Sequence, residues 1–132
     1  MPKNETFTIA SASDVVRVRQ AVRSLASELN FNIVDQTKLV TATSELARNT
    51  LQHGGGGGMK ATIVENGLRK GIQLTFEDQG PGIQNVELAM RDGYTTANGM
   101  GLGLSGSKRL VNEFDIKSEV GRGTTVTITR WK

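Results

Sequence analysis

The chain has 132 residues, of which 36% are hydrophobic and 22% charged, as in folded proteins with one compact core. It contains no cysteine, which excludes disulfides, thiolate metal sites and a cysteine nucleophile. The net charge is +3, but lysine and arginine are spread along the chain and aromatic residues are only 5%, so we expect no nucleic-acid partner.

The N-terminal half is predicted to form a short strand followed by two helices. The strand covers residues 6–10 and suits a sheet edge. A helix follows from residues 13–14 to about Asn30, with apolar side chains at helical spacing: Val15, Val18, Val22, Leu25 and Leu29. The second helix covers residues 35–52 and buries Leu39, Ala42, Leu46 and Thr50, before five consecutive glycines (54–58) end it.

The C-terminal half is predicted to be mainly strands. Residues 59–65 and 71–77 alternate as two strands joined by a hairpin loop at 66–70. Residues 84–103 have the chemistry of turns, with one short helical stretch at 86–91. A helix over 104–114 then precedes two final strands, 115–120 and 124–131, which are joined by the tight turn 121–123.

This order of elements predicts an α/β two-layer sandwich: a mixed, mainly antiparallel sheet with helices on one face. We expect one domain over residues 1–132. No apolar run approaches the roughly 20 residues that span a bilayer, so no membrane partner is expected. Residues 1–5 lack the apolar segment of a secretion signal, and we therefore expect a cytoplasmic protein.

Three polar residues, Glu45, Asn49 and His53, recur every four positions on the second predicted helix and form a column at the edge of its apolar stripe. An asparagine carbonyl suits Mg²⁺, and a glutamate one turn away suits a proton acceptor in phosphoryl transfer. His53 has no second histidine or cysteine for a metal site, so it fits a hydrogen-bonding residue beside a pocket. The alternative is an ordinary exposed helix face.

Two glycine-rich segments and a late threonine complete the set of candidate residues. Asp78 ends a strand, where its carboxylate can accept a hydrogen bond from the adenine amino group, and Gly80 and Gly82 let the backbone approach the base. Residues 99–103 lead into the predicted helix at Leu104, and free backbone N–H groups at a helix start suit phosphate. Thr124 follows the last turn. Taken singly, an Asp-Gly turn and a strand threonine are equally good interpretations.

Together these segments resemble the GHKL ATPase superfamily, whose nucleotide domain is the Bergerat fold. Residues 45–49 are similar to its N box, 78–83 to its first glycine box, 98–104 to its second, and Gly123-Thr124 to its terminal Gly-Thr element. The likeness extends over residues 12–131 and is most specific to the small bacterial serine kinases of partner-switching systems, which include anti-sigma factors. Two departures are Ala97-Asn98, where some relatives carry arginine, and the length of the five-glycine run.

The resemblance implies a role for each candidate residue. Glu45 would be the general base and Asn49 the Mg²⁺ ligand, while residues 86–98 would form a short lid over ATP. The remaining nucleotide-binding residues would be His53, Asp78, Gly80, Gly82, Ile83, Gly99, Met100, Gly101, Leu102, Gly103, Leu104 and Thr124.

The leading functional hypothesis is therefore a protein serine/threonine kinase of a stress-response or sigma-factor pathway. It would transfer the γ-phosphoryl group of Mg-ATP to a STAS-domain antagonist or scaffold protein and then release it toward another partner, such as a phosphatase or sigma factor. The first alternative is a non-catalytic binding module that sequesters a sigma factor or another regulator. A second, ATP-driven conformational work, is disfavoured because no transducer domain accompanies the predicted fold.

Overall fold

The computed structural model describes residues 4–90 and 104–132. The N-terminal half contains strand β1 (Asn4–Ile9), helix α1 (Ala12–Glu28), helix α2 (Ile33–Gln52) and strand β2 (Gly57–Asn66). Strand β3 (Arg69–Asp78) and the one-turn helix α3 (Val86–Ala89) follow. Helix α4 (Leu104–Arg109) then precedes strands β4 (Glu113–Glu119) and β5 (Gly123–Trp131).

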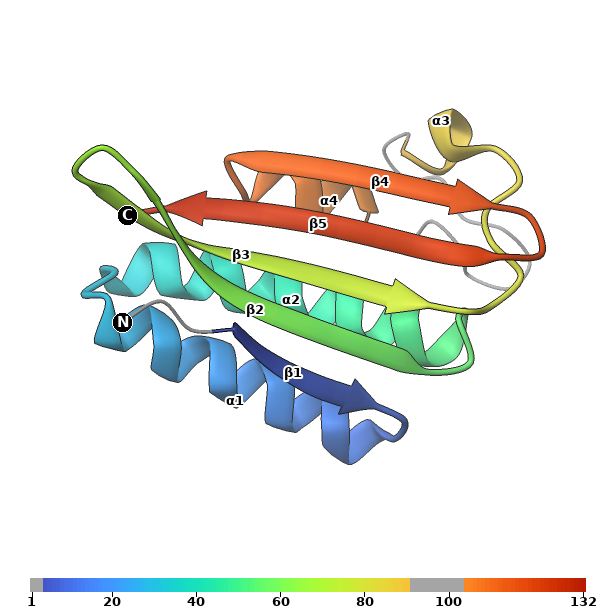
Figure 1. Cartoon of the computed structure of the whole chain (residues 1–132), viewed down its shortest axis with the longest axis horizontal. Coiled ribbons are helices and arrows are strands. Elements are labelled where there is room, and N and C mark those ends of the chain that lie inside the picture. The colour runs from blue at the N-terminus through green and yellow to red at the C-terminus, as the bar shows by residue number, and fades with distance from the viewer. Residues whose placement is uncertain (1–3, 91–103) are drawn as a thin grey trace.

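The five strands form one sheet in the order β1-β2-β3-β5-β4 (Figure 1). All four pairings between the described strands are antiparallel, so the parallel pairing that a mixed sheet needs is absent from this part of the chain. Strand β1 lies at a sheet edge, as the sequence predicted. The register places Asp78 opposite Thr124 across β3 and β5, which brings two candidate residues together at one end of the sheet.

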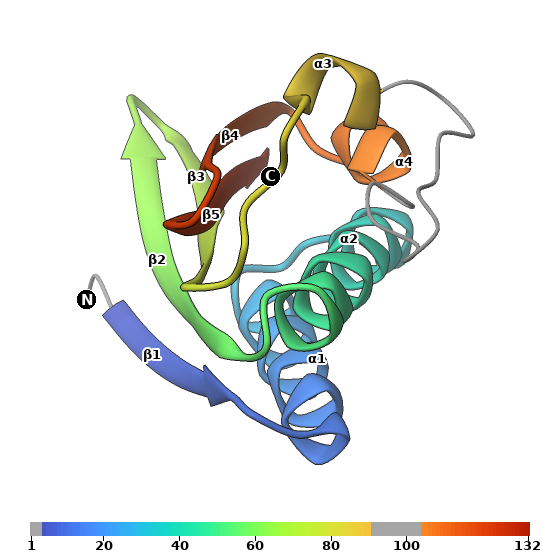
Figure 2. The same ribbon diagram turned by 90° about the vertical axis from the view of Figure 1, so that its right-hand side faces the viewer.

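The helices α1, α2 and α4 cover one face of the curved sheet (Figure 2), which confirms the predicted two-layer α/β sandwich. The core lies between the two layers. On α2, all four predicted residues of the apolar stripe are buried: Leu39, Ala42, Leu46 and Thr50. On the sheet, alternate residues of β3 point inward, namely Ile72, Leu74 and Phe76.

Local capping explains where the two long helices begin and where α1 ends. The Ser11 side chain accepts a hydrogen bond from the Asp14 N–H, and the Asn32 side chain accepts one from the Asp35 N–H, so each polar residue caps a helix start. Helix α1 ends where Asn30 takes a positive φ of 64° and the Phe31 N–H donates to the Ala26 carbonyl. The prediction that Asn30 ends this helix is confirmed.

The predicted helix over 104–114 is too long. Helix α4 ends at Arg109, and Phe114 already lies in β4. The physical reason is Asn112: its backbone N–H donates to the Thr129 carbonyl at 2.9 Å, and its side chain accepts from the Trp131 N–H at 2.7 Å. These contacts with β5 favour the sheet over a further helical turn.

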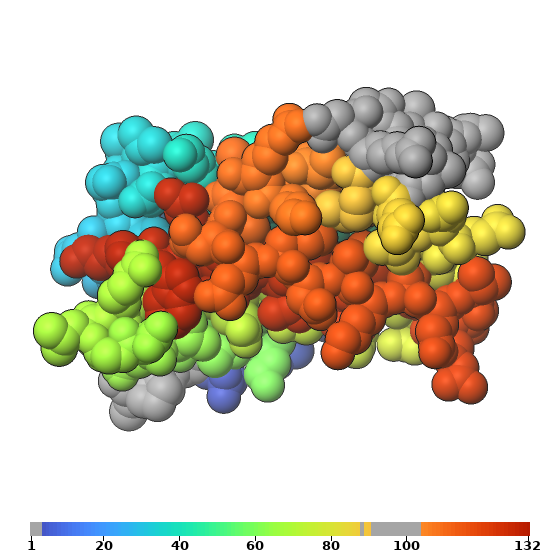
Figure 3. All heavy atoms as spheres, turned by 90° about the horizontal axis from the view of Figure 1, so that it is seen from above, coloured from blue at the N-terminus to red at the C-terminus, as the bar shows by residue number. Residues whose placement is uncertain are grey.

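The two ends of the sandwich differ in what they carry. Residues 80–85, helix α3 and the turn between β4 and β5 lie at one end, and the β2–β3 hairpin tip lies at the other (Figure 3). Helix α2 also ends at the end of the sandwich that carries α3, and Asp78, the last residue of β3, lies there too. Each helix in residues 4–90 and 104–132 is too short or too polar to span a lipid bilayer.

Candidate nucleotide-binding site

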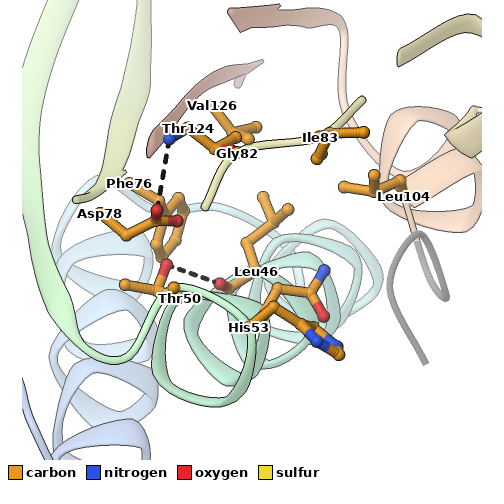
Figure 4. A pocket seen from close by; sticks show the side chains of 12 residues that line it. Leu46, Thr50, His53, Phe76, Asp78, Gly82, Ile83, Leu104, Thr124 and Val126 are labelled. Atoms are coloured by element: carbon orange, nitrogen blue, oxygen red, sulfur yellow. Dashed lines mark hydrogen bonds between the residues drawn. The ribbon is translucent and has the colours of Figure 1, made fainter. Parts of the chain in front are cut away.

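A pocket opens between the C-terminal half of α2 and the sheet, at the end that carries α3 (Figure 4). Its space between atoms is about 430 Å³, including the mouth to solvent. The inner walls are apolar, and polar groups are few, which is typical of small-molecule sites. The lining residues are Leu46, Asn49, Thr50, His53, Gly54, Phe76, Asp78, Gly82, Ile83, Leu104, Thr124 and Val126.

Asp78 is the carboxylate of this pocket, and the backbone fixes its orientation. Its Oδ1 atom accepts hydrogen bonds from the N–H of Gly80 at 2.9 Å and from the N–H of Thr124 at 3.2 Å (Figure 4 draws the second). Within the described part of the chain, Oδ2 has no hydrogen-bond partner. The residue therefore offers one anchored oxygen and one free acceptor to a ligand with an N–H donor.

Gly54 explains how Asp78 comes so close to the end of α2. A Cβ atom at position 54 would lie 2.3 Å from Asp78 Cγ and 2.6 Å from its Oδ2. A Cβ at Gly80 would in turn lie 2.7 Å from Gly54 Cα. Three backbone segments thus meet at van der Waals contact, and the first glycine of the five-glycine run is required for the pocket rather than for flexibility.

Gly82 has a different requirement. Its φ is 78°, in the left-handed region, and a Cβ there would lie 2.2 Å from the Glu119 carbonyl oxygen. Only glycine fits this conformation and this contact. The turn that follows β3 is thereby pressed against the end of β4, and it carries Ile83 into the pocket wall.

The polar column on α2 is only partly in the pocket. Asn49 and His53 line it, but Glu45, one turn earlier, is not among the lining residues. Glu45 instead forms an ion pair with Arg48 at 3.1 Å, and its side chain is 35% exposed. The carboxylate and the amide thus lie on one helix face, with the carboxylate further from the buried end of the pocket.

The donor set at this position fits Mg²⁺ held mainly by a ligand's phosphates. Mg²⁺ takes few protein ligands beside phosphate oxygens and water, and the Asn49 amide oxygen is a suitable one. No group of three or more histidine, aspartate or glutamate side chains that would hold a metal without a nucleotide occurs in the described residues. The site therefore suits a cation that arrives with its nucleotide.

A hydroxyl network borders the pocket on the sheet side. Thr124 Oγ1 lies 2.8 Å from Ser118 Oγ, and the Ile83 N–H donates to Ser118 Oγ at 2.7 Å. Sequence reasoning placed Thr124 at the site and missed Ser118. Ser118 occupies an inward position of an alternating strand, where a small polar residue beside Phe114 and Ile116 was the available signal.

Seven of the predicted site residues are brought together by the structure: Asn49, His53, Asp78, Gly82, Ile83, Leu104 and Thr124. Gly80 adjoins them through Asp78. Gly99, Met100, Gly101, Leu102 and Gly103 lie outside the described residues, as does most of the predicted lid. The sequence reasoning missed Gly54, Phe76 and Val126 as pocket residues, and assigned Leu46 and Thr50 to the core alone.

Comparison with known proteins places the chain in a family. Residues 34–132 match the family described as histidine kinase-, DNA gyrase B- and HSP90-like ATPases. The serine/threonine-protein kinase RsbT of Bacillus subtilis is 43% identical over 118 residues, which cover 89% of each chain. The anti-sigma F factor of a Geobacillus species is 28% identical and covers 86% of this chain and 81% of its own.

Solved structures share the fold. The RsbU and RsbW domains of a Mycobacterium tuberculosis protein match with a TM-score of 0.66 at 24% identity, covering 98% of this chain and 31% of that one. The catalytic domain of the histidine kinase ThkA matches with a TM-score of 0.55 at 16% identity, covering 98% of both chains. The chain therefore belongs to the histidine kinase-, DNA gyrase B- and HSP90-like ATPase family, the predicted GHKL superfamily, and is a relative of the kinase RsbT.

Proposed function

We propose that residues 1–132 work as one ATP-binding protein serine/threonine kinase domain of a bacterial partner-switching pathway. The observation that carries this proposal is the pocket itself. An anchored carboxylate, Asp78, and an amide, Asn49, line the same cavity. The chain around them is 43% identical to a serine/threonine-protein kinase along nearly its whole length.

In this proposal the pocket selects adenine through Asp78 and packs the base against apolar walls. The free Oδ2 atom accepts a hydrogen bond from the exocyclic amino group, while Oδ1 stays bound to two backbone N–H groups. Leu46, Phe76 and Ile83 supply the apolar contact surface. Guanine carries a carbonyl in place of the amino group, so it would set an acceptor against an acceptor.

The phosphate end of the nucleotide extends along α2 toward Glu45. Asn49 would hold Mg²⁺, which supplies neutralising charge to the phosphate oxygens during transfer. Glu45, one helical turn further, would accept the proton of the attacking serine or threonine hydroxyl. Its ion pair with Arg48 is half-exposed and therefore easily exchanged for a substrate contact.

The protein substrate we propose is a STAS-domain antagonist or scaffold protein. A phosphate formed within a docked interface adds like-charge repulsion and a desolvation cost, so phosphorylation would release the kinase toward another partner, such as a phosphatase or sigma factor. The cytoplasm, where ATP is supplied, is the compartment that this role requires.

Phosphoryl transfer tests the proposal. Purified protein is incubated with radiolabelled Mg-ATP and candidate STAS-domain proteins from its own organism. Glu45→Gln should lower the transfer rate at least about 100-fold, while its affinity for ATP stays within about twofold because Glu45 does not line the pocket. Glu28→Gln, which alters an exposed carboxylate at the end of α1, is the matched control and should retain full activity.

Two outcomes would contradict the proposed roles. Undiminished transfer by Glu45→Gln would exclude Glu45 as the base. ATP-dependent partner binding without transfer to any STAS-domain protein would instead support a nucleotide-modulated binding module.

A further inference from the structure

Ser118 joins three separate segments that form the sheet side of the pocket. Its Oγ atom accepts a hydrogen bond from the Ile83 N–H at 2.7 Å and donates one to the Gly123 carbonyl oxygen at 3.2 Å. The same atom lies 2.8 Å from Thr124 Oγ1. Ile83 and Thr124 line the pocket, whereas Ser118 does not. Ser118 would therefore affect a ligand in this pocket only indirectly, through Ile83 and Thr124.

The proton count of this hydroxyl limits what Thr124 can present to a ligand. A serine hydroxyl donates one hydrogen bond and accepts two. All three contacts are satisfied together only when Ser118 donates to the Gly123 carbonyl and accepts from both the Ile83 N–H and the Thr124 O–H. In that arrangement the Thr124 proton points at Ser118, and only the Thr124 lone pairs remain for the pocket.

The reverse direction satisfies fewer groups. If Ser118 donated to Thr124, its contact with the Gly123 carbonyl would be lost, and Thr124 would turn its own proton toward the pocket. The Thr124 backbone N–H donates to Asp78 Oδ1, so the two residues lie side by side. Thr124 and Asp78 are thus held next to each other with acceptor atoms available.

We propose that Ser118 is a positioning residue that fixes the Thr124 hydroxyl as a hydrogen-bond acceptor, so that the pocket favours a purine with a 6-amino group over one with a 6-carbonyl. The two N–H donors of an amino group match two neighbouring acceptors, Asp78 Oδ2 and Thr124 Oγ1, and a carbonyl matches neither. This inference rests on the proposed nucleotide function and adds a determinant of base selectivity to it.

Titration calorimetry with Mg-ATP and Mg-ITP tests the inference, because the two nucleotides differ only in the groups at the 6-position edge of the base. The wild type should bind ATP more tightly than ITP. Ser118→Ala should lower this ATP-to-ITP affinity ratio about tenfold, since the Thr124 proton is then free to rotate toward a carbonyl. Ser118→Thr keeps the hydroxyl and should retain the ratio, as should Ser24→Ala, which removes an exposed hydroxyl on α1.

A double-mutant cycle separates positioning from general destabilisation. In a Thr124→Val background, Ser118→Ala should leave the ATP-to-ITP ratio unchanged, because the hydroxyl through which Ser118 acts is gone. If Ser118→Ala does not fold, Ser118→Cys replaces it, because it keeps the side-chain volume and has only a weakly hydrogen-bonding thiol.

The result that overturns the inference is an equal loss of ATP and ITP affinity, or no loss, in the Ser118 variants of a protein that binds ATP. That pattern would make Ser118 a structural residue only. Failure of the wild type to bind either nucleotide would overturn the proposed function itself, so the two failures are distinguishable.

Discussion

Replacement of Gly54 by alanine should weaken nucleotide binding about 100-fold although it adds only one methyl group. The new Cβ would lie 2.3 Å from Asp78 Cγ, 2.4 Å from its Cβ and 2.6 Å from its Oδ2. Carbon atoms in contact normally lie about 3.5–4.0 Å apart, so the Asp78 side chain must move by roughly 1 Å or more. Asp78 is the residue to which we assign recognition of adenine.

The size of the effect follows from the contacts that this movement disrupts. Asp78 Oδ1 accepts two backbone hydrogen bonds, and a hydrogen bond to a charged group contributes about 1.5–3 kcal/mol. Overpacking of a tight site costs about 1–3 kcal/mol. Because the moved side chain can keep part of its bonding, we expect stability to fall by about 2–3 kcal/mol. Affinity for ATP should fall by up to about 100-fold, because loss of the hydrogen bond from adenine to the Asp78 carboxylate costs about 1.5–3 kcal/mol.

Gly55→Ala provides the matched control within the same run of glycines. A Cβ at Gly55 has no neighbour within 4 Å, but its φ of 75° is strained for alanine. This variant should lose about 1–2 kcal/mol of stability and keep its ATP affinity. Urea denaturation gives the stabilities and calorimetry the affinities. Wild-type affinity in Gly54→Ala would refute the assignment of Asp78, and equal losses of affinity in both variants would show that the run acts through flexibility.

Further predictions concern stability at sites away from the pocket. Asp35→Ala removes the ion-pair partner of Arg130, whose side chain is 14% exposed and whose Nε has no hydrogen-bond partner in the described residues. Urea denaturation should therefore show a loss of stability of about 2–3 kcal/mol. A loss no larger than that of Asp115→Ala, which removes an exposed carboxylate on β4, would contradict a structural role for the pair. The Ala10 N–H lowers the pKa of Asp14 below its ordinary value of 3.8. The ionised Asp14 carboxylate therefore stabilises the fold fully above a pH of 3.8, its ordinary pKa, and this stabilisation is lost as the pH falls through the lowered pKa. Asp14→Asn should destabilise the protein at neutral pH and flatten its stability profile at acid pH; an unchanged profile would show that the carboxylate contributes nothing.

Features set by short-range periodicity could be predicted from the sequence. The α2 stripe of Leu39, Ala42, Leu46 and Thr50 follows from helical spacing alone, and all four residues are buried. Asn30 ends α1 because few residues other than glycine accept its positive φ. The end of α4 could not be predicted in this way, because Leu110, Val111 and Phe114 continue a helix-like apolar spacing. Contacts of Asn112 with β5, distant in sequence, decide that end.

The same distinction applies to the site. The sequence predicted three of the pocket residues, Asn49, Asp78 and Thr124, because their side chains suit nucleotide binding and they lie in segments that resemble family motifs. The individual requirement at Gly54 could not be predicted, because it depends on Asp78 arriving from another strand. Ser118 was missed for a related reason: a single serine in an alternating strand gains its importance only from the loop and the turn that meet it.

Asn49 and Asp78 line one pocket, to which we assign an adenine nucleotide. Calorimetric titration of the purified wild-type protein with Mg-ATP is the decisive experiment. We expect saturable heat with one ATP per chain and at least about tenfold weaker binding of Mg-GTP. Absence of heat with Mg-ATP, or equal affinity for the two nucleotides, would contradict this assignment.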